Sequence, residues 1–74
     1  METIKRIERV LRHIFEDQSI KISENTTASD IPAWDSLMHM TVISEIEEEF
    51  GLTFTFNEVS GFNKIGDIVK CIDK

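Results

Sequence analysis

Ser36 lies in a setting in which its hydroxyl could do chemistry, within the stretch WDSLMHM at residues 34–40. His39 follows three positions later. Residues three apart share one side of a helix, so the imidazole is a candidate base for a serine nucleophile. A hydrolase also needs a group that orients the imidazole, an oxyanion hole and a substrate pocket. The sequence supplies no residues for these parts, and we do not favour catalysis by this pair.

A second use of Ser36 is as a site of covalent modification. Asp35 is a good helix N-cap, which places Ser36 in the first turn of the helix that follows. Backbone N–H groups and the helix dipole favour an anion there, such as a phosphodiester. A third interpretation is that Ser36 merely begins the helix. The tripeptide Asp-Ser-Leu alone does not separate these interpretations.

The elements around Ser36 predict an all-α fold: a small helical bundle of three main helices, a short helical turn and a long first loop. The first helix is expected from Glu2 to Glu16, with apolar residues at helical spacing. Its predicted buried stripe consists of Ile4, Ile7, Val10, Leu11, Ile14 and Phe15, and His13 is expected at the surface. Residues 17–34 predict a long ordered loop, anchored to the core by Ile20, Ile22, Ile31 and Trp34.

The helix that contains Ser36 is expected to run from Ser36 to Phe50, with Gly51 as its stop signal. The predicted buried stripe is Val42, Ile43, Ile46 and Phe50, with His39 at its margin. The predicted outward face carries a hydroxyl, apolar side chains and acids: Ser36, Leu37, Met40, Thr41, Ser44, Glu47 and Glu48. Exposed apolar residues beside acids indicate a surface that partners contact.

The last third of the chain predicts a connector and two further helical segments. Leu52, Phe54 and Phe56 alternate with threonines, but the chain has no second strand to pair with, so we expect an extended connector with its aromatics in the core. Asn57 is expected to cap a helical turn at residues 58–61. The final helix is expected at residues 64–72, where it would bury Ile65, Ile68, Val69 and Ile72.

Length and charge narrow the function classes. The chain has 74 residues and a net charge of −6, and a single domain is predicted over residues 1–74. Residues 22–63 contain eight acidic residues and no Lys or Arg. Such a field repels phosphate backbones and attracts basic protein surfaces, so nucleic-acid binding is not expected. A domain this small also has little room for a deep active site.

The cysteine content and the N-terminal stretch predict a reducing, cytoplasmic location. Cys71 is the single cysteine, which excludes an internal disulfide and a cysteine-based zinc site, and we expect it to pack as a small core residue. No metal site is predicted. No apolar run approaches the length of a membrane span, and the charged start METIKRIERV is unlike a signal peptide. Nothing in the sequence requires more than a monomer.

The stretch WDSLMHMTVISEIEEEFG resembles the acyl carrier protein family. The resemblance covers essentially the whole chain, including the long loop before the serine and the closing helix KIGDIVKCI. It implies a non-catalytic carrier with a covalent 4′-phosphopantetheine, taken from coenzyme A by a phosphopantetheinyl transferase. The arm would hold acyl or aminoacyl groups as thioesters.

Carried over residue by residue, the resemblance implies attachment at Ser36, with Asp35 and Leu37 as its recognition context. It implies partner contacts on the same helix by Leu37, Met40, Thr41, Glu47 and Glu48. The implied partners, besides the transferase, are a loading ligase and downstream acyltransferase or synthase enzymes with basic docking surfaces. Glu45 and Glu49 are expected to form a solvated flank.

The chain departs from the fatty-acid carriers of the family before and after the serine. Pro32-Ala33-Trp34 stands where a glycine is usual, and His39, Thr41 and Ser44 follow. This pattern is similar to free-standing carriers of specialised pathways, and fatty acid or polyketide biosynthesis stays open. An aminoacyl or peptidyl carrier of a non-ribosomal-peptide-type pathway is the first alternative. An unmodified helical adaptor domain is the second.

Overall fold

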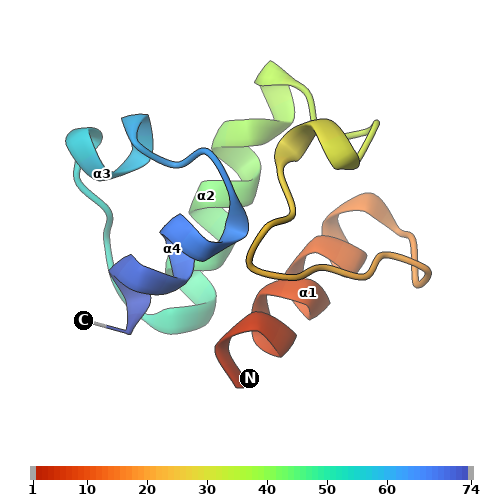
Figure 1. Cartoon of the computed structure of the whole chain (residues 1–74), viewed down its shortest axis with the longest axis horizontal. Helices are drawn as coiled ribbons and strands as arrows, with labels where there is room; N and C mark the ends of the chain where they lie inside the picture. The colour runs from red at the N-terminus through yellow and green to blue at the C-terminus, as the bar shows by residue number, and fades with distance from the viewer. Residues whose placement is uncertain (1, 74) are drawn as a thin grey trace.

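The computed structural model describes residues 2–73, and they form a helical fold (Figure 1). Its elements are α1 (Glu2–Phe15), the short 3₁₀ helix η1 (Ala28–Asp30), α2 (Ser36–Phe50), α3 (Phe56–Ser60) and α4 (Ile65–Ile72). The prediction of an all-α bundle with a long first loop is confirmed. Over the described residues, none of these helices has the length and apolar character needed to cross a membrane.

A single core joins all the long helices. α1 packs against both α2 and α4. The buried residues come from these helices, the first loop and the connector before α3: Ile7, Leu11, Ile20, Ile31, Trp34, Val42, Ile43, Ile46, Phe54, Ile65, Ile68 and Val69. Ile4, Val10, Ile14 and Phe15 are half-buried against this core, as are Phe50, Cys71 and Ile72. The predicted apolar stripes therefore face inward, and His13 is exposed as expected.

The first loop is fixed at both of its flanks. Close to α1, Arg12 donates to the backbone carbonyl of Ile20 at 2.8 Å, and Glu8 accepts the Ile22 N–H at 3.0 Å. Further along, the loop reaches the start of α4 (Figure 1), where the N–H groups of Ile65 and Gly66 donate to backbone carbonyls of Thr26 and Glu24, each at 2.8 Å. These carbonyls satisfy N–H groups of α4 that have no partner within the helix. The loop is thus part of the scaffold.

The expectation for the segment before α3 was wrong in one respect. Phe54 is buried and packs edge-on against Phe62, with ring centroids 5.1 Å apart, but Phe56 is 84% exposed. The reason is that α3 begins at Phe56, one residue before the predicted cap. Thr55 accepts the Glu58 N–H at 3.1 Å, and Glu58 accepts the Thr55 N–H at 2.8 Å. This reciprocal capping box fixes the start of the helix and turns Phe56 to solvent.

Candidate functional site

Ser36 is the first residue of α2, and its side chain is exposed. Asp35 precedes it in an extended conformation, and the Asp35 carboxylate accepts the Met38 N–H at 2.9 Å. The predicted N-cap is therefore confirmed. Gly51 ends the helix in the left-handed conformation, with φ of 65°, which glycine adopts at little cost. Both predicted ends of α2 are correct, and the Ser36 hydroxyl lies at the positive end of the helix dipole.

An open depression of about 350 Å³ lies beside the Ser36 hydroxyl, lined by Ala28, Trp34, Asp35, Ser36 and His39. The first loop and the first turns of α2 form it together. A phosphodiester on Ser36 would therefore have space along the surface, next to backbone N–H groups that favour an anion.

Trp34 and His39, which both line this depression, interact directly. The indole Nε1–H donates to His39 Nδ1 at 3.3 Å, and the rings stack with centroids 6.1 Å apart. A neutral imidazole whose Nδ1 accepts this hydrogen bond carries its proton on Nε2, so neither ring nitrogen is free to act as a base toward Ser36. This removes the main support for a serine nucleophile. Sequence reasoning did not find this pair, because Trp34 precedes the helix and helical spacing does not relate it to His39.

The outward face of α2 is largely as predicted. Leu37 is 86% exposed and Met40 is 62% exposed. Thr41, Ser44 and Glu48 are also exposed. Large exposed apolar side chains next to an exposed serine at a helix start indicate a contact surface.

Glu47 does not lie free on this outward face, which corrects the prediction. It is half-buried, and its carboxylate accepts the Phe54 N–H at 2.7 Å. The chain turns at Gly51 and runs back past the end of α2, so the backbone of Phe54 comes within reach of Glu47. The Glu47 carboxylate therefore fixes the connector to α2.

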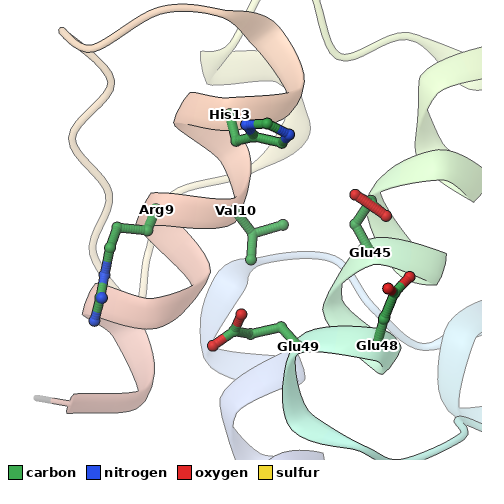
Figure 2. Close-up of a pocket in the computed structure, with 6 residues that line it drawn as sticks. All are labelled: Arg9, Val10, His13, Glu45, Glu48 and Glu49. Atoms are coloured by element: carbon green, nitrogen blue, oxygen red, sulfur yellow. The ribbon is translucent and has the colours of Figure 1, made fainter.

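Of the predicted solvated flank, Glu49 is exposed as expected, whereas Glu45 is half-buried. Glu49 forms an ion pair with Arg6 of α1 at 2.9 Å, and the Arg6 guanidinium lies 4.2 Å from the ring centre of Phe50. Next to this pair, α1 and α2 enclose a hollow of about 370 Å³, lined by Arg9, Val10, His13, Glu45, Glu48 and Glu49. Figure 2 shows Val10 pointing toward α2, while Arg9 points away from the glutamates. These contacts hold α1 to α2.

Comparison with known proteins assigns the family. Residues 7–72 match the family model described as the phosphopantetheine attachment site. The fold is similar to the solution NMR structure of the holo acyl carrier protein from Geobacter metallireducens, with a TM-score of 0.89 and 34% sequence identity. That alignment covers 99% of this chain and 84% of the other. The chain belongs to the acyl carrier protein family.

Membership settles the class of activity. Proteins of this family are carriers and not enzymes, and they hold 4′-phosphopantetheine covalently. The site in this carrier fits such a group on two observations. A serine hydroxyl is exposed on the first turn of α2, and the depression beside it is open to solvent and lies at the same helix end.

Proposed function

We propose that Ser36 is the residue to which 4′-phosphopantetheine is attached, and that this carrier presents acyl thioesters to the enzymes of a specialised biosynthetic pathway. The observation that carries the proposal is the exposed Ser36 hydroxyl at the capped start of α2, beside an open depression. The match of WDSLMHMTVISEIEEEFG to the family's pattern supports the same residue.

Attachment requires the Ser36 oxygen to attack the phosphorus that bears the pantetheine in coenzyme A. A new O–P bond forms, the diphosphate P–O bond breaks, adenosine 3′,5′-bisphosphate leaves, and a base of the transferase takes the serine proton. Asp35 contributes by capping α2, which holds the hydroxyl at the helix end, where the helix dipole would favour the new phosphodiester. Once bound, the group supplies a flexible arm whose thiol holds the cargo as a thioester.

The partner surface proposed for this carrier consists of Leu37, Met40, Thr41 and Glu48, all exposed on α2. Leu37 and Met40 supply an apolar contact, and Glu48 attracts basic partner surfaces and speeds association. A single exposed ion pair contributes about 0–1 kcal/mol, so each complex is weak and short-lived. Weak binding suits a carrier that moves from the transferase to a loading ligase and then to acyltransferases or synthases.

The specialised pathway is supported by the residues that distinguish this chain from fatty-acid carriers. Pro32-Ala33-Trp34 stands before the serine where fatty-acid carriers usually have a glycine. The Trp34 indole donates a hydrogen bond to His39. The cytoplasm is the location proposed for this carrier, where coenzyme A and a transferase are at hand and the thiol of Cys71 stays reduced.

The test is intact mass after incubation with coenzyme A and a broad-specificity phosphopantetheinyl transferase. We expect the wild type to gain one phosphopantetheine and Ser36→Ala to gain none. Ser44→Ala is a matched control, because Ser44 is an exposed serine on the same helix, and it should be modified like the wild type. Equal modification of Ser36→Ala and the wild type, or none in any folded variant, would refute the proposal.

A further inference from the structure

Two spaces meet at the start of α2, and they share part of their walls. The open depression beside Ser36 is one of them. The other is a small, partly open cavity of about 30 Å³ between the first loop and the start of α4, lined by Thr26, Ala28, Trp34, His39, Phe62, Asn63, Lys64, Ile65 and Ile68. Ala28, Trp34 and His39 line both spaces. These three residues form the boundary between the surface near Ser36 and the small cavity beside α4, whose lining includes the buried residues Ile65 and Ile68.

The small cavity cannot hold an alkyl chain. A cavity needs about 10–15 Å³ of such space to hold one water molecule, so 30 Å³ holds no more than a few. A dry protein cavity of about 150 Å³ is needed to hold one benzene molecule. An acyl group could enter the interior only if the boundary moved aside.

The boundary is held at several points. Trp34 is only 8% exposed, its backbone N–H donates to Ile31 at 2.9 Å, and its indole donates to His39. The ring of Phe15 also lies next to Trp34, and the centroids of the two rings are 6.4 Å apart. Asp35, the cap of α2, follows directly in the chain. Moving Trp34 would therefore disturb the helix start that carries Ser36.

We propose that Trp34 and His39 are specificity-determining residues that close the route from Ser36 to the interior and leave the cargo at the surface. This inference rests on attachment at Ser36. The cargo that suits such a carrier is an acyl group too short or too polar to gain from burial. The depression is lined mainly by apolar surface, but Asp35 and His39 also place polar groups in it, which is compatible with a hydroxyl or amine group on a short cargo.

The experiment uses the full chain loaded with acetyl-, butyryl- or octanoyl-phosphopantetheine from the corresponding acyl-coenzyme A. Intact mass first establishes loading, so a failure of attachment is recognised before the cargo is tested. The readout is the rate of thioester cleavage by hydroxylamine, with the emission of Trp34, the one tryptophan in the chain, as a second signal. A thioester that is buried in nine of ten molecules is cleaved about tenfold more slowly, because only the open fraction reacts.

For the wild type we expect equal cleavage rates for all three cargoes and no change in Trp34 emission. For His39→Ala, which removes the acceptor of the indole, we expect the octanoyl thioester to be protected and the emission to shift. Trp34→Phe is a second, separate variant, which removes the indole donor instead of its acceptor. Its readout is the cleavage rate. His13→Ala, at the exposed histidine of α1, is the matched control and should behave like the wild type.

Protection of the octanoyl thioester in the wild type would overturn the proposal, because the route would then be open already. Equal rates for all cargoes in both folded variants would overturn the role of Trp34 and His39. Slow cleavage of the octanoyl thioester in either folded variant, or in both, supports it.

Discussion

Two neighbouring glutamates on α2, Glu47 and Glu48, have the same side chain but different surroundings. The Glu47 carboxylate accepts the Phe54 N–H, whereas Glu48 is exposed on the surface that we propose for partners. A hydrogen bond from a backbone donor to a charged acceptor contributes more to stability than a neutral one. Glu47 should therefore act mainly on folding, and Glu48 mainly on association.

Charge reversal separates these roles. We expect Glu48→Lys to leave the free energy of unfolding nearly unchanged and to slow modification by the transferase, by roughly two- to tenfold at low salt. Glu47→Lys should lower the free energy of unfolding by about 1–3 kcal/mol, because the Phe54 N–H loses its partner. Urea unfolding and transferase rates at two salt concentrations measure both effects.

Glu47→Gln is the control, since the amide oxygen can still accept the Phe54 N–H. It should keep most of the stability that Glu47→Lys loses. If Glu48→Lys were modified at the wild-type rate at low salt, Glu48 would have no part in docking.

The contact between the first loop and α4 depends on the absence of a side chain at Gly66. Gly66 donates its N–H to the Glu24 carbonyl at 2.8 Å, and a Cβ at this position would lie 3.1 Å from the same oxygen. Such a separation is tighter than ordinary van der Waals contact. A side chain at position 66 would push the loop away from the start of α4.

We expect Gly66→Val to lower the free energy of unfolding by about 1–3 kcal/mol, as over-packing does in a tight site. Gly61→Val is the matched control, because a Cβ there lies at the ordinary distance of 3.6 Å from its nearest neighbours and φ at Gly61 is −89°. Urea unfolding of both variants measures the difference. Equal stability of the two would show that the loop adjusts without cost.

The same elements show what could be predicted from the sequence. α2 was predicted correctly at both ends because Asp35 and Gly51 carry local signals for a start and a stop. The isolated isoleucines predicted an anchored loop. The start of α3 was missed although Thr55 and Glu58 match a capping box, so the signal was present.

Long-range contacts were out of reach of sequence reasoning. Arg6 and Glu49 are far apart in the chain, and they meet only because α1 packs against the end of α2. The Trp34–His39 pair and the bond from Phe54 to Glu47 depend in the same way on the path of irregular backbone. At the candidate site, local capping rules placed Ser36, but they contain no information on the boundary beneath it.

Charge is distributed unevenly over the whole molecule. The net charge is −6, and residues 22–63 hold no Lys or Arg. α1 supplies the nearest cations, with Arg6 bound to Glu49 and Arg12 bound to Glu8 at 3.1 Å. These pairs are partly exposed and contribute little each, so at neutral pH the folded chain retains an excess of mutually repelling carboxylates. Partial protonation of the acids relieves that repulsion.

Asp17 and Asp67 have the opposite effect on stability at lower pH, because their protonation destabilises the folded protein. Hydrogen bonds from the Ser19 side chain and backbone lower the pKa of Asp17 below its ordinary value of 3.8. The backbone N–H of Asn63, followed by that of Lys64, likewise lowers the pKa of Asp67. Because both pKa values are lower in the folded protein, this stabilisation is complete above 3.8 and is lost as pH falls through the folded values.

The free energy of unfolding should therefore be at least as high at about pH 5 as at about pH 7, and it should fall as the pH drops below about 4. Urea unfolding across this range measures the curve.

In the double variant Asp17→Asn and Asp67→Asn, the loss of stability below about pH 4 should be smaller, since these two groups no longer take up protons on unfolding. Replacing Glu45 and Glu48 with Gln removes the same amount of charge from the hollow between α1 and α2 (Figure 2), and this control should leave the slope on the acid side unchanged. An acid side equally steep in the double aspartate variant and the wild type would show that repulsion among the basic residues, and not these two hydrogen-bonded carboxylates, unfolds the protein in acid.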